Sequence, residues 1–166
     1  MADRTDGDKP RTHDYSLLVR WTGNQGSGTS SYRAFSRAHE VGAPGVTTIP
    51  GSADPAFRGD PARWNPEQLF VAALAQCHML WYLHLAATSG LIVTGYEDAA
   101  IGTMVEAPDG GGEFSSVTLR PTVTIAPGGD EALAHELHER ANALCFIARS
   151  VKTPVHHEVT IVRTPA

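Results

Sequence analysis

The segment from Glu67 to Ser89 is almost wholly apolar, and its length and composition predict one long helix. Asn65 suits the N-cap, Pro66 suits the first helical position, and Gly90 is a residue that commonly ends a helix. A helix that is apolar on nearly every face must be buried on nearly every face. Because 166 residues make only one domain of ordinary size, we expect a partner subunit to cover part of this helix.

The rest of the chain is predicted to supply strands, one further helix and long loops. We expect strands over residues 15–21, 29–41, 91–106, 114–125 and 156–162, a short strand near 46–49, and a second helix over 131–148. The glycine-rich stretch 23–28 joins the first two strands into a hairpin, Pro121 indicates an edge strand or a bulge, and Asp130 caps the second helix. This order predicts an α+β fold with one domain over residues 13–166, after a disordered tail over residues 1–12.

Composition excludes several classes of protein. A hydrophobic content of 42% is enough for a real core, and a net charge of -5 argues against a nucleic-acid binder. The polar N-terminus lacks the apolar stretch of a signal peptide, and we expect no apolar run long enough for a membrane span. Two cysteines are too few for a disulfide-rich secreted scaffold. These features predict a cytoplasmic protein that binds neither nucleic acid nor a membrane.

The function depends on what Cys77 and Cys145 do. One interpretation is that both are small buried hydrophobic residues, which is common for free cysteine. A zinc site is disfavoured because Cys77 and His84 share a helix face but no set of four ligands accompanies them, so we expect no metal. A protease-like pair is disfavoured because His78 turns about 100° away from Cys77 on a helix. The remaining alternative is a redox pair.

The residues just before the long helix favour the redox alternative. A reactive cysteine needs a nearby positive charge that lowers its pKa, and a carboxylate can hold that cation in place. Arg58, Arg63 and Glu67 all lie within the eleven residues that lead into the helix carrying Cys77.

Two motifs carry a resemblance to a known family. The stretch from Asn65 to Cys77, NPEQLFVAALAQC, resembles the OsmC/Ohr family of thiol peroxidases, whose signature is N-P-E-x-L, a helix of small residues and a cysteine. The stretch from Cys145 to Val151, CFIARSV, resembles the second motif of the same family. The resemblance implies an OsmC-like fold: an N-terminal β-hairpin, a long buried central helix, a β-hairpin, a second helix and a final strand, assembled as an intertwined dimer.

The resemblance also implies an enzyme of the oxidative stress response. It would be a cysteine-based organic hydroperoxide reductase, an antioxidant oxidoreductase with peroxiredoxin-like activity. Cys77 would attack the peroxide and become a sulfenic acid, and Cys145 would resolve it to a disulfide. Arg58 would stabilise the thiolate, and Glu67 would orient the guanidinium. No cofactor is implied, and an external dithiol or a lipoylated protein would reset the pair.

Several alternatives stay open at this point. The arginine lies in different places in different branches of the family, so Arg33, Arg37 and Arg63 are alternatives to Arg58. A pocket for the alkyl chain would be lined by Phe70, Met79, Trp81 and Tyr82, although core and dimer packing explain these four residues equally well. Four histidines are interpreted as solvated surface residues: His135, His138, His156 and His157. The alternative function is a non-catalytic OsmC-like module that binds an apolar ligand.

Helix geometry supports the expected homodimer. In a continuous helix, ten residues separate Glu67 from Cys77 by about 15 Å along the axis. A glutamate side chain does not cover that distance, so Glu67 would serve the cysteine of a second chain packed antiparallel to the first. The expected partners are therefore a second copy of the chain, a small apolar hydroperoxide and a thiol reductant.

Overall fold

The computed structural model describes residues 11–164 and divides into two compact units, with the boundary in sequence between Asn65 and Pro66. Residues 1–10 of the predicted tail lie outside the described residues. The organisation of residues 13–166 as a single domain stays a prediction.

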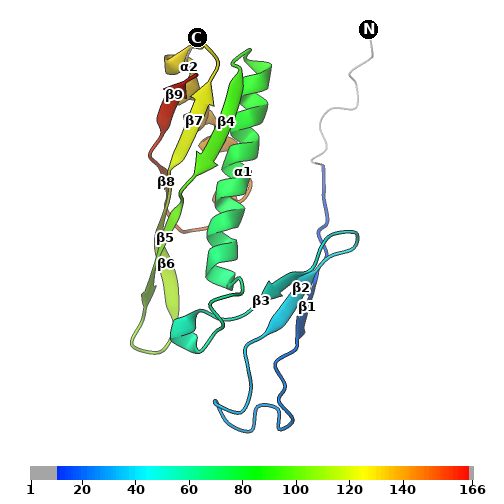
Figure 1. The fold of residues 1–166 in the computed structure, drawn as a ribbon. Coiled ribbons are helices and arrows are strands. Elements are labelled where there is room, and N and C mark those ends of the chain that lie inside the picture. The colour runs from blue at the N-terminus through cyan, green and yellow to red at the C-terminus, as the bar shows by residue number, and fades with distance from the viewer. Residues whose placement is uncertain (1–10, 165–166) are drawn as a thin grey trace. The chain divides into compact units, whose positions relative to one another are not determined.

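The first unit is built on a three-stranded antiparallel sheet. Strand β1 (Leu18–Trp21) pairs with β2 (His39–Gly42), and β2 pairs with β3 (Ile49–Gly51) (Figure 1). The predicted N-terminal hairpin is confirmed, although its second strand begins at His39 and not near residue 29. The indole nitrogen of Trp21 donates to the Ser36 carbonyl at 2.9 Å, which ties the long connection to the end of β1. A short 3-10 helix, η1 (Pro55–Phe57), follows in the loop.

Helix α1 (Pro66–Thr88) opens the second unit and confirms the predicted long helix. Gly90 ends it with φ 75°, a left-handed conformation that favours glycine. Five residues of α1 are buried, at the three- and four-residue spacing of a single helical stripe: Leu74, His78, Tyr82, Leu85 and Ala86. Leu80, on another face, is 62% exposed. Within this chain the helix is therefore buried on one side only.

By length and composition, α1 is also long and apolar enough to cross a membrane. The expectation that no apolar run reaches this length was wrong. A core helix of a soluble protein passes the same test, and α1 packs against α2 and the sheets of the second unit.

The second unit contains two three-stranded sheets. They have the orders β4-β7-β9 and β5-β6-β8, and in each the first pair is antiparallel and the second is parallel. The strands are β4 (Val93–Asp98), β5 (Ile101–Glu106), β6 (Gly112–Leu119), β7 (Pro121–Ile125), β8 (Val155–His157) and β9 (Thr160–Arg163). The three strands predicted over 91–106, 114–125 and 156–162 are thus each divided in two.

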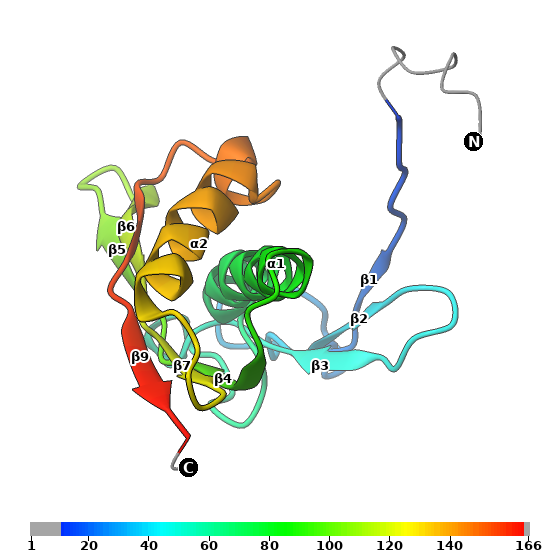
Figure 2. The ribbon, with the colours of Figure 1, turned by 90° about the horizontal axis from the view of Figure 1, so that it is seen from above.

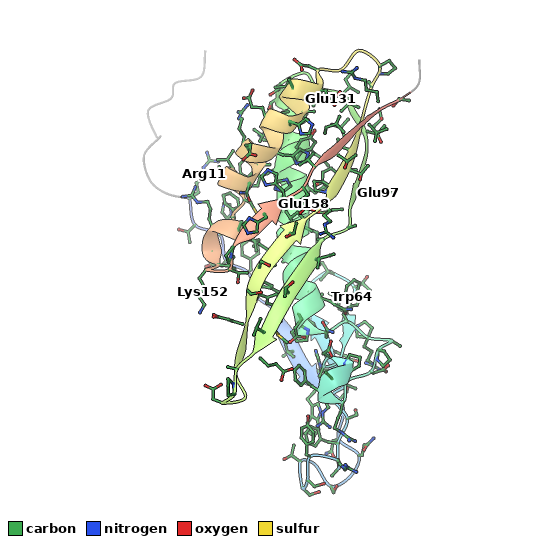
Figure 3. All side chains as sticks on the ribbon, turned by 90° about the vertical axis from the view of Figure 1, so that its left-hand side faces the viewer. Arg11, Trp64, Glu97, Glu131, Lys152 and Glu158 are labelled. Atoms are coloured by element: carbon green, nitrogen blue, oxygen red, sulfur yellow. The ribbon has the colours of Figure 1, made fainter. Side chains whose placement is uncertain are left out.

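Arg120 accounts for where the strands divide. Its backbone N–H donates to the side-chain oxygen Oδ1 of Asp98 at 2.7 Å. This N–H therefore does not bond to a backbone carbonyl of a neighbouring strand. The Arg120 Nε donates to Glu158 Oε2 at 2.9 Å, and Glu158 lies between β8 and β9 (Figure 3). Pro121 follows as the first residue of β7, where no ladder N–H is needed. Because β7 lies between β4 and β9, Pro121 is not on an edge strand; it lies instead next to the interruption between β6 and β7.

Helix α2 (Glu131–Leu144) lies beside α1 on the same face of the sheets (Figure 2). Asp130 caps it as predicted, because its Oδ1 accepts from the Leu133 N–H at 3.1 Å. The helix ends at Leu144, earlier than the predicted residue 148, and a short 3-10 helix, η2 (Ala148–Ser150), follows. The core between the two helices and β7 contains Tyr82, Leu137 and Val123.

Candidate active site

The two cysteines of the chain lie in contact between α1 and α2. Cys77 is half-buried on α1, and Cys145 is 1% exposed at the C-terminal end of α2. A side-chain hydrogen bond joins the two thiols. Two residues that are 68 positions apart in the sequence are thus placed where a disulfide can form between them.

The position of the Cys145 side chain is determined by the turn that ends α2. The residue leaves the helical conformation with φ -62° and ψ 113°, and its carbonyl accepts from the Arg149 N–H at 3.0 Å as the chain turns into η2. The Ala148 N–H donates to the Cys145 Sγ at 3.4 Å. Burial and the hydrogen bond with Cys77 raise the pKa of the Cys145 thiol, which outweighs the opposite effect of the backbone N–H. The Cys145 thiol therefore stays protonated near neutral pH.

A second contact between the helices lies next to the thiols. Trp81 is one helical turn after Cys77, so both side chains lie on one face of α1. The Trp81 ring packs edge-on against Phe146 with centroids 5.5 Å apart, and Phe146 follows Cys145 directly and is 68% exposed. Of the four residues predicted to line a pocket, Trp81 is the one that lies beside a cysteine of the pair.

The other three predicted pocket residues lie elsewhere on α1. Phe70 packs against Phe114 with centroids 4.7 Å apart, and Met79 is half-buried. Tyr82 is fully buried and stacks on His138. The structure does not bring the four residues together on one surface, and their role in a pocket stays a prediction.

Glu67 lies in the first turn of α1, where the helix dipole favours a negative charge. Its Oε2 atom is buried and has no hydrogen-bond partner among the described residues. Because α1 is continuous from Pro66 to Thr88, Glu67 is about 15 Å from Cys77 along the helix axis. The Glu67 carboxylate therefore does not reach the cysteine of its own helix.

The four candidate arginines lie in the first unit. Arg58 is exposed and has a φ of 65°, the one non-glycine residue with a positive φ in the described chain. Arg37 is the most firmly held, because its two terminal nitrogens donate to the Phe35 and Tyr32 carbonyls at 2.7 and 2.9 Å. Arg63 pairs with Asp60 at 3.5 Å, and Arg33 is exposed. The choice of Arg58 as the catalytic arginine stays a prediction.

The interpretation of four histidines as solvated holds for His135 and His156, which are exposed, and was wrong for the other two. His138 is fully buried, and the side chain of His157 is 12% exposed and bonds to Glu139 at 3.1 Å. His138 follows the buried Leu137 and lies one helical turn after the buried Ala134. Its place on the apolar stripe of α2 was therefore visible in the spacing.

No group of three or more histidine, cysteine or acidic side chains in residues 11–164 is arranged to hold a metal ion. The chemistry available at the contact between the helices is that of two neighbouring thiols. The fold and this contact define an α+β protein with a cysteine pair between its two helices.

Comparison with known proteins agrees with this description. Residues 59–160 match the family described as OsmC-like protein. An OsmC-like protein of unknown function from Vibrio cholerae is 32% identical, with a TM-score of 0.81 over 89% of this chain and 99% of that one. The uncharacterized protein YmaD of Bacillus subtilis is 25% identical over 84% of this chain and 87% of its own length. An organic hydroperoxide resistance protein from Elizabethkingia anophelis shares the fold, with 18% identity, a TM-score of 0.65, and coverage of 93% of this chain and 100% of that one.

The chain belongs to the OsmC-like protein family. The family and the α+β fold expected from the sequence motifs are confirmed.

Proposed function

We propose that this protein is a cysteine-based peroxidase that reduces organic hydroperoxides to alcohols. The observation that carries the proposal is the hydrogen-bonded contact between the half-buried Cys77 and the buried Cys145. Membership of a family that includes organic hydroperoxide resistance proteins supports it. Two cysteines that served only to fill the core would both be expected to be buried, whereas Cys77 is partly exposed to solvent and Cys145 is not.

The reaction balances with these two residues. The Cys77 thiolate attacks the terminal oxygen of the hydroperoxide, the O–O bond breaks, and the alkoxide leaves and takes a proton to become the alcohol. Cys77 is then a sulfenic acid. The Cys145 sulfur attacks the Cys77 sulfur, a disulfide forms, and water leaves. An external dithiol, either a small molecule or a lipoylated protein, reduces the disulfide and is itself oxidised, so the cycle uses no resident cofactor.

Glu67 and an arginine complete the proposed site. The orphaned Oε2 atom of Glu67 needs a donor, and a guanidinium is the donor that pairs best with a carboxylate. In this proposal Arg58 stabilises the Cys77 thiolate and the charge that develops on the leaving oxygen, while Glu67 orients Arg58. The exposure of Arg58 is compatible with this role.

The proposed site requires two chains. The continuous α1 helix keeps Glu67 away from the Cys77 of the same chain, so the carboxylate can serve only a second copy. The exposed Leu80 on α1 is an apolar residue that such a copy would cover. A homodimer with two equivalent sites follows.

A thiol titration tests the proposal. Reduced protein is mixed with increasing amounts of cumene hydroperoxide, and the thiols, the disulfide and the alcohol are quantified. One equivalent should yield one alcohol and one Cys77–Cys145 disulfide in the wild type. Cys145→Ser should yield one alcohol and a sulfenic acid on Cys77. Cys77→Ser, the matched control, should yield neither. A non-catalytic binding module would leave both thiols of the wild type and the one thiol of each variant intact.

A further inference from the structure

Two histidines bond to each other in the core of the second unit. Nε2 of His78 on α1 lies 2.9 Å from Nδ1 of His138 on α2, and the two ring planes are 12° from parallel with centroids 5.2 Å apart. The two side chains are 1% and 0% exposed. This hydrogen bond crosses the same helix–helix interface as the contact between the cysteines.

The surroundings of the pair hold aromatic rings and leave it without a direct counter-charge. Tyr82 stacks on His138 with centroids 3.8 Å apart. Nδ1 of His78 and Nε2 of His138 are buried without a partner among the described residues. The titratable groups around the pair from its own helices and from β4 and β8 are Tyr82, His135, Glu139, Tyr96, Asp98 and His157. The two carboxylates among them bond to other groups, Asp98 to the Arg120 N–H and Glu139 to His157.

The histidine pair and the cysteine pair are neighbours on both helices. On α1, His78 follows Cys77 directly, so the two residues are about 1.5 Å apart along the helix axis and their side chains point about 100° apart. On α2, His138 lies seven residues, about two turns, before Cys145. A change in the distance between the helices at the histidines therefore also changes the distance between the thiols, because a densely packed interface transmits strain.

We propose that the His78–His138 hydrogen bond is the positioning contact that holds the Cys77 thiol opposite the Cys145 thiol, and that proton uptake by this pair separates the thiols and stops disulfide formation. The inference rests on the proposed function, because it concerns the regulation of the same cysteine pair. His78 and His138 are positioning residues and do not touch the hydroperoxide.

The hydrogen bond needs one donor nitrogen and one acceptor nitrogen, which two neutral imidazoles supply. One proton from the solvent places an uncompensated charge among aromatic rings. A second proton makes both nitrogens donors, so the bond is lost. Burial lowers the pKa of His78 to about 4, and burial with the neighbouring histidines lowers that of His138 to about 3. The pair is therefore neutral at neutral pH, and the cysteines are held together there.

The test compares three variants by the equilibrium of the Cys77–Cys145 disulfide with glutathione in the full chain. His78→Phe keeps a ring and removes the bond, so the effective concentration of the pair should fall by about tenfold, as the loss of about 1.4 kcal/mol from one hydrogen bond implies. His78→Gln can place its amide nitrogen where Nε2 lies, and should restore the wild-type value. His135→Phe, at an exposed site on α2, is the control and should have no effect. An unchanged equilibrium in His78→Phe would overturn the inference.

A second measurement does not depend on whether the variants at His78 fold. In a chain with Trp21→Phe, Trp64→Phe and His84→Gln, the fluorescence of Trp81 reports its packing against Phe146 beside the thiols, without the titratable ring of His84 next to it. On acidification this signal should change before helical circular dichroism is lost. Simultaneous loss of both signals would contradict the inference. If the wild type forms no Cys77–Cys145 disulfide at all, the proposed function fails; if it forms one that His78→Phe leaves unchanged, only the positioning role fails.

Discussion

The Cys77 thiol hydrogen-bonds to the Cys145 thiol across the interface of α1 and α2, and only Cys77 is appreciably accessible from solvent. This asymmetry predicts different reactivities. At pH 7.5, iodoacetamide should alkylate Cys145 at least about tenfold more slowly than Cys77, because burial and the hydrogen bond raise the pKa of Cys145 and reduce its thiolate fraction. Peptide mass spectrometry over time gives both rates. Equal rates in urea are the control, and faster alkylation of Cys145 in the folded protein would reverse the assigned roles.

Glu67→Ala should reduce hydroperoxide turnover by at least about tenfold, a barrier increase of about 1.4 kcal/mol, because the arginine at the site loses the carboxylate that orients it. Thermal stability should fall only slightly, because a carboxylate in the first turn of a helix contributes about 0.3–1 kcal/mol. Glu131→Ala is the matched control, because Glu131 also lies in the first turn of a helix and is exposed. Equal turnover in the two variants would remove Glu67 from the site.

Subunit mixing tests whether the site is shared between chains. Cys77→Ser and Glu67→Ala are each expected to be inactive or nearly so as pure proteins. Under conditions of subunit exchange, each mixed dimer should regain one working site, because its intact Cys77 then meets an intact Glu67. A mixture of Cys77→Ser and Cys77→Ala is the control and should regain nothing. Light scattering that shows an active monomer would contradict the shared site.

Acid should destabilise the second unit through His78 and His138. Their pKa values are about 4 and about 3 in the folded protein, against an ordinary value of 6.5. Below pH 6.5 the unfolded chain therefore binds more protons than the folded one, so the free energy of unfolding falls as the pH drops towards 4. Above pH 6.5 the pair contributes no pH dependence. Thermal melts between pH 4 and pH 8 measure the slope.

The matched controls for that slope use one buried and one exposed histidine. His138→Phe should flatten the fall between pH 6.5 and pH 4, because it removes one of the two groups. His156→Gln should leave the slope as in the wild type, since His156 is exposed and is not among the groups that lower the pKa of His78 or His138. Equal slopes in all three proteins would show that the acid sensitivity comes from other groups.

The apolar surroundings of Cys77 predict a preference for alkyl hydroperoxides over hydrogen peroxide. Each methylene buried against Trp81 or its neighbours contributes up to ~0.8 kcal/mol, about fourfold in kcat/KM. A series of hydroperoxides of increasing chain length measures this increment. Trp81→Ala should reduce it, whereas Thr88→Ala, at an exposed site near the C-terminal end of α1, should not. Equal kcat/KM for hydrogen peroxide and cumene hydroperoxide would rule out the apolar site.

Short sequence motifs were sufficient to predict the two helices and to identify the family. The Asn65–Pro66–Glu67 start, the Gly90 end and the Asp130 cap are determined by neighbouring residues, and the observed helices agree with them to within a few positions. The two cysteine motifs identified the family that the comparisons confirm.

The division of the long strands depended on contacts that no local pattern contains. Arg120 bonds to Asp98, 22 residues earlier, and to Glu158, 38 residues later, and these contacts decide where the strands break. The case of His138 differs: its spacing from Ala134 indicates the buried stripe of α2, but it was taken for a surface residue because its partner His78 is 60 residues away. Polarity alone suggested exposure, whereas the hydrogen bond that permits burial became visible only in the fold.

The proposed peroxidase activity depends most directly on the thiol chemistry of Cys77. The decisive measurement is steady-state consumption of cumene hydroperoxide by the reduced protein with dihydrolipoamide as the electron donor, comparing the wild type with Cys77→Ser. We predict sustained turnover with one alcohol formed for each dithiol oxidised in the wild type, and only the uncatalysed rate in Cys77→Ser. The same rate in both proteins, or no turnover in the wild type with any dithiol, would contradict the assignment of this protein as a peroxidase.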